Sequence, residues 1–159
     1  MTTANEYQAQ GIRLFKQKEY EEAARAFQQA IEAYETDGRT DMVGEMQTNI
    51  GLGHRALGEQ QQALDIMQQA LAHFQEAGDA LRAAKVLGNL GGVFVALGDR
   101  DQAYTCYRHA ADAFQELGET QLYGETLLAL GDLQVREGKL MAGASTYEVG
   151  LEQPPELTP

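Results

Sequence analysis

Residues 87–119 read LGNLGGVFVALGDRDQAYTCYRHAADAFQELGE, and this stretch decides the fold. Stepping forty residues in either direction finds the same residue types at the same places. Six columns of residues repeat in this way: Gly11, Gly51, Gly91 and Gly131; Gly58, Gly98 and Gly138; Gly38, Gly78 and Gly118; Ala23, Ala63 and Ala103; Ala30, Ala70 and Ala110; Tyr34, Phe74 and Phe114. Six columns in one register indicate a structural repeat of forty residues.

Two of the glycine columns mark the ends of helices. Each glycine in them precedes a charged residue, and Gly98 follows the apolar run GGVFVAL. The residue just past a helix often needs a positive φ, which glycine adopts at little cost. Stops about every twenty residues predict two helices in each unit. The predicted helices span 4–17, 20–36, 41–57, 60–77, 80–97, 100–117, 120–137 and 140–152.

The third glycine column falls in the middle of helices. A glycine there costs about 1 kcal/mol relative to alanine, so its recurrence needs a compensating reason. Close approach of the second helix of the hairpin supplies one. Twelve residues after Gly51 comes Ala63, and seven later Ala70, so we expect small residues to face small residues where the helices cross.

This pattern resembles the tetratricopeptide repeat, in the forty-residue variety of spindle-orientation adaptors, kinesin light chain and bacterial repeat arrays. The resemblance covers residues 4–152. It implies an all-α fold, a right-handed α-solenoid of about four stacked helix-turn-helix hairpins. The domain would span residues 1–152, with units of about 4–36, 41–77, 80–117 and 120–152. Its expected role is that of a scaffold or adaptor that binds a peptide or helix of a partner protein.

The fourth unit departs from the pattern. Gly143 and Gly150 stand where the other units carry alanine, and each is expected to weaken the last helix by about 1 kcal/mol. We expect residues 153–159 to form a disordered tail, because Pro154 and Pro155 disfavour helix. Repeat arrays normally need a polar outer end. The alternative function is therefore a homo-oligomeric assembly module that associates through an uncapped C-terminal repeat.

In the family that the chain resembles, the first helix of each hairpin lines a concave inner surface. Residues three, four and seven apart share one face of a helix, so the lining positions follow from the helix ranges. They are Asn5, Gln8, Ala9, Ile12, Phe15 and Lys16; Glu45, Thr48, Asn49, Leu52, Arg55 and Ala56; Lys85, Gly88, Asn89, Gly92, Val95 and Ala96; Glu125, Leu128, Ala129, Asp132, Val135 and Arg136.

Two groups of these residues carry the candidate binding site. Asn49 and Asn89 lie forty apart, and an amide can pair with both groups of a peptide bond. In the resembled family such asparagines hold the backbone of an extended peptide; the alternative is that they only stabilise stacking. The second group is the basic side chains on this surface, which favour an acidic peptide unless they pair with carboxylates on the same face. They are Lys16, Arg55, Lys85 and Arg136. The candidate peptide-binding residues are Asn49, Asn89, Arg55, Lys85, Leu52, Val95, Gln8, Lys16 and Arg136.

Composition argues against other classes of function. Twenty-four carboxylates against twelve Lys and Arg give a net charge of −12, which disfavours nucleic acid and anionic membranes as partners. A single cysteine and the lack of a long apolar run favour a cytoplasmic protein. His54, His73 and His109 match no metal spacing, and the glycines form no phosphate-binding loop. We therefore expect no metal, no cofactor and no enzymatic activity.

Overall fold

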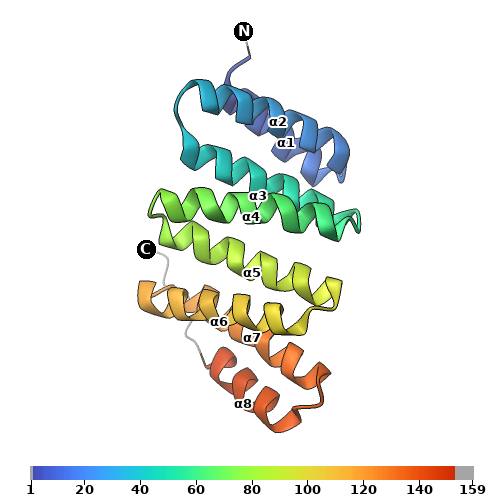
Figure 1. Cartoon of the computed structure of the whole chain (residues 1–159), viewed down its shortest axis with the longest axis vertical. Helices are drawn as coiled ribbons and strands as arrows, with labels where there is room; N and C mark the ends of the chain where they lie inside the picture. Colours follow the sequence, from blue (N-terminus) through green and yellow to red (C-terminus); the bar gives the residue numbers. More distant parts are fainter. Residues whose placement is uncertain (1, 153–159) are drawn as a thin grey trace. The chain divides into compact units, whose positions relative to one another are not determined.

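A computed structural model describes residues 2–152, and within them the fold is all-α (Figure 1). The helices are α1 (Ala4–Lys16), α2 (Tyr20–Thr36), α3 (Thr40–Ala56), α4 (Gln60–Glu76), α5 (Ala80–Leu97), α6 (Arg100–Leu117), α7 (Thr120–Arg136) and α8 (Leu140–Leu151). Each begins and ends within one residue of its predicted range. The all-α class and the repeated helical hairpin are confirmed. The tail predicted for residues 153–159 lies outside the described residues.

The chain divides into two compact halves, one ending at Asp79 and the other beginning at Ala80. From here on we call these halves the first and the second unit, and each contains two of the forty-residue repeats. The first contains α1–α4, where α1 packs on α2, α2 on α3 and α3 on α4. The second contains α5–α8 in the same sequential arrangement. Each unit is therefore a pair of helical hairpins, visible in Figure 1 as helices that fold back on their neighbours. A single domain over residues 1–152 stays a prediction.

The turn glycines adopt the left-handed conformation that their columns predict. Six of them adopt positive φ, for example Gly118 at 72°. At this turn the backbone N–H of Gly118 donates to the carbonyl of Gln115 (3.2 Å), and that of Glu119 donates to Phe114 (2.9 Å). These bonds satisfy carbonyls that the end of α6 leaves without helical partners. Glycine is favoured here because a Cβ would strain a left-handed backbone.

One turn lacks its glycine. Lys18 lies forty residues before Gly58 and adopts the same left-handed conformation, with φ of 62°. Among residues 2–152 it is the one residue other than glycine with a positive φ. The left-handed conformation costs a lysine roughly 1–2 kcal/mol of steric strain.

Lys18→Gly is expected to raise the free energy of unfolding by about 1 kcal/mol, because glycine removes that strain despite its more flexible unfolded state. Urea unfolding followed by circular dichroism measures the change. Gln17→Gly is the matched control, since Gln17 has a φ of −81° and gains nothing from glycine. An equal effect of the two substitutions would contradict strain at Lys18.

The mid-helix glycines lie at close helix crossings, as predicted, but the side chains opposite them are large. A Cβ on Gly11 would lie 2.5 Å from the ring of Phe27, and one on Gly91 2.6 Å from the ring of Tyr107. At Gly51 the contact is Met67, at 2.7 Å. The expectation that alanines would fill this place was wrong. The side chain sixteen residues after each glycine packs against the backbone of that glycine. The alanines are buried beside this contact.

Gly143 and Gly150, which the sequence predicts to weaken α8, lie at a close crossing of α7 and α8. A Cβ on Gly143 would lie 2.5 Å from Cγ2 of Val135 and 3.0 Å from the carbonyl oxygen of Gly131. One on Gly150 would lie 3.0 Å from the carbonyl oxygen of Gly124. Close packing of α7 on α8 requires both glycines, so their poor helix propensity has a packing reason.

Helix α5 is long and strongly apolar. Its 18 residues have a mean hydropathy of 1.4, so by length and composition it could cross a membrane. In the structure 39% of that window is buried, and the helix packs on α6. The core helix of a soluble protein passes the same test, so a single helix of this kind is weak evidence for a membrane span.

Candidate functional site

The second unit contains a hollow of about 350 Å³ between α5 and α7, with residues of α6 contributing to its lining. We call it the α5–α7 hollow. Its size falls at the lower end of the range for ligand pockets. Residues on α5 and α7 that share one face of each helix form most of it. The lining residues are Lys85, Gly88, Asn89, Tyr107, Phe114, Leu122, Glu125, Thr126 and Ala129.

Asn89 and Lys85 supply the polar chemistry that a ligand could use. Asn89 is half-buried, and its amide forms no hydrogen bond with any of the residues that the structure describes. Lys85 is exposed, and within residues 2–152 no carboxylate lies close enough to form an ion pair with it. The other polar side chains are satisfied. Thr126 donates to the carbonyl of Leu122 (2.7 Å), and Glu125 accepts a hydrogen bond from Gln121 (3.2 Å).

Gly88 keeps the hollow open. A Cβ built on it would meet no atom within 4 Å. The crossing glycines Gly11, Gly51 and Gly91 differ, because a Cβ on each would collide with a packed side chain. Helix packing therefore does not require a glycine at position 88, although glycine lowers the stability of a helix there by about 1 kcal/mol. The effect of Gly88 is to leave space beside Asn89.

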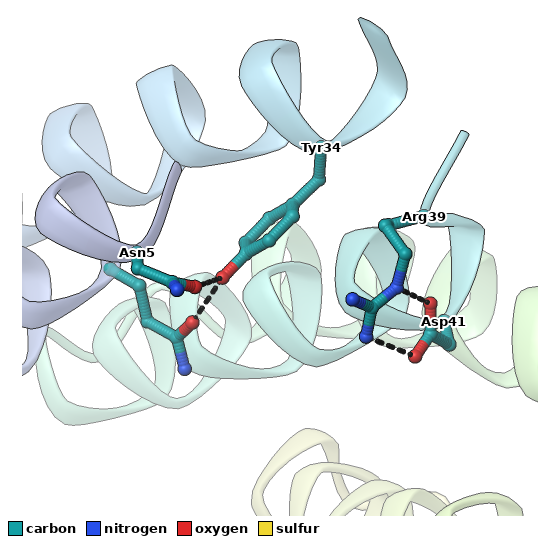
Figure 2. A network of polar contacts seen from close by, with 5 residues as sticks. Asn5, Tyr34, Arg39 and Asp41 are labelled. Carbon is teal, nitrogen blue, oxygen red and sulfur yellow. Dashed lines mark hydrogen bonds and ion pairs between the residues drawn. The ribbon is translucent and has the colours of Figure 1, made fainter. Parts of the chain in front are cut away.

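In the first unit the equivalent place is filled. Figure 2 shows the hydroxyl of Tyr34 reaching from α2 to the side chain of Asn5 on α1. The same hydroxyl also donates to the side chain of Gln8 on α1. Its oxygen lies 2.8 Å from Oδ1 of Asn5 and 2.5 Å from Oε1 of Gln8. A phenol has one proton, so the Tyr34 hydroxyl donates to one of these two amide oxygens at a time.

The repeat makes the comparison between the two places direct. Gln8 and Gly88 are eighty residues apart and hold the same position in their units, as do Tyr34 and Phe114. In the first unit an amide side chain lies over the aromatic residue and is bound to its hydroxyl. In the second, both the amide and the hydroxyl are missing. The first unit therefore uses in folding the space that the second leaves open.

A surface ion pair flanks the Tyr34 network at the start of α3. The guanidinium of Arg39 donates twice to the carboxylate of Asp41, with both distances 3.1 Å (Figure 2). This bond lowers the pKa of Asp41, while burial raises the pKa of Tyr34. Both partners are at least partly exposed, so the pair contributes little to stability. It orients the α2–α3 turn rather than a ligand.

The structure brings together Lys85 and Asn89 of the nine candidate residues and leaves the rest elsewhere. Asn49 and Leu52 are half-buried on α3, whereas Arg55 and Lys16 are exposed in the last turns of their helices. Two others have partners within their own unit: Val95 packs on the core of the second unit, and Arg136 pairs with Asp132 at 3.2 Å. Gln8 is bound to Tyr34.

Sequence reasoning did not nominate the residues that complete the hollow. Leu122 and Thr126 lie one turn apart on α7, and Tyr107 lies on α6. The forty-residue column that contains Phe114 was visible, but it indicated packing alone. The signal that could have identified Tyr107 was its place sixteen residues after Gly91.

Two of the three histidines have side-chain partners, while His109 is exposed on α6. His73 shares a hydrogen bond with Gln47 (2.8 Å), and His54 lies 3.4 Å from Glu59. Burial raises the pKa of the Cys106 thiol, which disfavours the reactive thiolate. Within residues 2–152 no three His, Cys, Asp or Glu side chains are grouped to hold a metal ion.

Two family models match the chain. The model described as tetratricopeptide repeat matches residues 3–76. The tetratricopeptide-type repeat recognised in the sequence is confirmed there. The model described as soluble NSF attachment protein, SNAP, which is of the same TPR-like kind, matches residues 54–151, more than half of the chain. The chain belongs to that family. A comparison with curated protein sequences finds no match.

Several solved structures share the tetratricopeptide-type fold of this chain. BtubC (BKLC) from P. vanneervenii matches with a TM-score of 0.83 at 18% identity, over 98% of this chain and 67% of that one. The apo form of RapI gives 0.86 at 13%, over 93% and 41%. The Rap conjugation gene regulator of plasmid pLS20, in complex with the Phr* peptide, gives 0.79 at 18%, over 94% and 41%.

At these identities the likeness shows the fold alone. The chain corresponds to 41% of the length of each of the two Rap proteins. Tetratricopeptide-type repeats are in general protein-interaction scaffolds, and the fold supports that coarse role for this chain.

Proposed function

We propose that this protein binds an extended peptide, or a helix of a partner protein, in the α5–α7 hollow. The observation that carries the proposal is the half-buried amide of Asn89 beside the space left by Gly88. An amide offers a donor and an acceptor together, which is what one peptide unit of a ligand presents. No catalytic step is part of the proposal, and the proposed location is the cytoplasm.

The chemistry of the hollow indicates the kind of peptide that fits. The space at Gly88 takes one side chain, and Phe114, Leu122 and Ala129 give it apolar walls. Lys85 lies next to it without an ion partner among the described residues, so it favours a carboxylate. The proposed ligand therefore carries an apolar side chain close to an acidic group. The complex of the structurally similar Rap regulator with a peptide supports peptide binding by this fold.

Selection from a displayed library of random peptides tests the proposal. We expect the intact chain to enrich peptides with an apolar residue near Asp or Glu. The selected peptide, synthesised with a fluorescent label, should bind with a dissociation constant of about 1 µM, an ordinary affinity for such a site. Fluorescence anisotropy measures it. Failure to enrich any family of peptides would count against binding in the hollow.

Asn89→Ala is expected to weaken the selected peptide about fivefold, because the bound peptide loses a hydrogen bond to this amide that is worth about 1 kcal/mol. Far-UV circular dichroism and melting should stay unchanged. Asn49→Ala is the matched control, because Asn49 holds the position of Asn89 on α3 and does not line the hollow. Unaltered affinity in the Asn89→Ala variant would refute the role of its amide.

A further inference from the structure

The outer surface of α8 carries a row of apolar side chains. Leu140, Ala144, Tyr147 and Leu151 follow the spacing four, three, four, which places them on one side of the helix. We call them the α8 stripe. Leu140 is 64% exposed and Leu151 72% exposed, while Ala144 is exposed and Tyr147 half-buried. Met141, beside the stripe, is 86% exposed. Exposed apolar side chains grouped in this way are typical of a docking surface.

The repeat shows what normally covers these positions. The stripe positions in α2, 120 residues earlier, are Tyr20, Ala24, Phe27 and Ile31. There Phe27 and Ile31 are buried in one cluster with Val43, Met46 and Ile50 of α3, and Ile31 is 5% exposed.

Three of the four positions in α6, forty residues earlier, behave alike. Tyr107 and Ala111 are buried with Leu127 and Leu130 of α7, and Tyr104 packs against that cluster. The fourth, Arg100 at the position of Leu140, is exposed. In both units the other three positions of a second helix are therefore covered by the following helix. The α8 stripe has the side chains for such a contact.

The first helix of the chain does not match the stripe. In α3, the residues that pack on α2 are Val43, Met46 and Ile50. The same repeat positions in α1 and its N-cap are polar and exposed: Thr3, Glu6 and Gln10. A head-to-tail stack of copies would place the leucines of α8 on charged and amide groups, which would lose their hydration without gaining partners.

The low charge of α8 also favours contact between the α8 helices of two copies. The chain carries a net charge of −12, so two copies repel over most of their surface. Within α8 the one charged side chain is Glu148, which lies outside the stripe. Two α8 helices can therefore meet with little repulsion between them. We propose that the α8 stripe packs on the α8 stripe of a second copy of this chain, in a two-fold symmetric dimer.

This proposal is independent of the α5–α7 hollow, and sedimentation of the intact chain tests it. We expect a monomer–dimer equilibrium across a concentration series. Leu140→Glu with Leu151→Glu should weaken the dimer about 100-fold, because it removes two large apolar side chains from the contact and introduces like charges. Leu117→Glu is the matched control, since Leu117 is an exposed leucine of α6 outside the stripe, and it should leave the dimer unchanged.

Cross-linking distinguishes the two-fold dimer from its competitors. Ala144→Cys should form a disulfide between two copies of the same variant. A disulfide that forms when Ala144→Cys is mixed with Gln10→Cys, but not with Ala144→Cys alone, would overturn the proposal in favour of a head-to-tail stack.

Two further results would overturn the proposal. One is a strictly monomeric chain whose α8 amides are protected from hydrogen exchange. The other is a chain that is monomeric when intact and dimeric only when it ends at Glu152, because residues 153–159 would then be the occupant of the stripe.

Discussion

Phe27→Ala is expected to lower the free energy of unfolding by about 3–5 kcal/mol, a large share of the stability of an ordinary domain. Phe27 is 1% exposed and belongs to the cluster that joins α2 to α3. Its ring also lies against the backbone of Gly11. Truncation therefore removes contacts to the preceding and the following helix at once. Urea unfolding of the variant, monitored by circular dichroism, measures the loss.

A double-mutant cycle tests whether the ring of Phe27 is the reason that position 11 requires glycine. Gly11→Ala alone should cost about 1–3 kcal/mol, since its Cβ would lie 2.5 Å from Phe27. With Phe27→Ala in place the same substitution meets little obstruction, so the double variant should be more stable than the sum predicts, by about 1 kcal/mol or more. Gly11→Ala combined with Phe114→Ala should be additive. Additivity in both pairs would contradict the contact.

Gly88→Gln is expected to weaken the selected peptide about 30-fold while leaving the protein at least as stable as before. The new side chain occupies the space that the hollow leaves open, as Gln8 does in the first unit. Exclusion of a bound side chain from a packed site costs about 2 kcal/mol, which corresponds to this factor. Replacing a mid-helix glycine also favours the helix by about 0.5–1 kcal/mol.

The opposite signs of the two effects make the result diagnostic. A variant that merely disturbed folding would lose peptide affinity and stability together. Thr48→Gln is the matched control, because Thr48 holds the same repeat position on α3 of the first unit. It should leave affinity for the hollow unchanged. If Gly88→Gln bound the peptide as tightly as the unmodified chain, the ligand would not occupy the hollow.

The fold was predictable because the constraints that set it act on residue identity. A left-handed turn favours glycine, and a tight helix crossing favours glycine or alanine, so both leave identical letters forty residues apart. The column of Phe27, Met67, Tyr107 and Tyr147 escaped notice because the space above a glycine demands volume rather than one residue type. Lys18 shows that even the turn constraint can be met at a cost.

The site was predictable only in part. Helical periodicity indicated which residues share the face of α5, including Lys85, Gly88 and Asn89. It could not separate Gly88 from the crossing glycines, because that distinction depends on the atoms opposite each Cα. Tyr34 was grouped with Phe74 and Phe114 as an aromatic residue, although its hydroxyl binds the amides that fill the first unit. Such differences depend on single atoms that a pattern of residue types does not resolve.

The sequential packing of the helices has a consequence for folding kinetics. In each unit the helix pairs that make most of the contacts are neighbours along the chain, so few contacts require distant segments to meet. Proteins with such low contact order fold in about microseconds to milliseconds. A single hairpin, closed by one aromatic ring or methionine over one glycine, can form before its neighbours are ordered. We expect a partly synthesised chain to fold hairpin by hairpin as it leaves the ribosome.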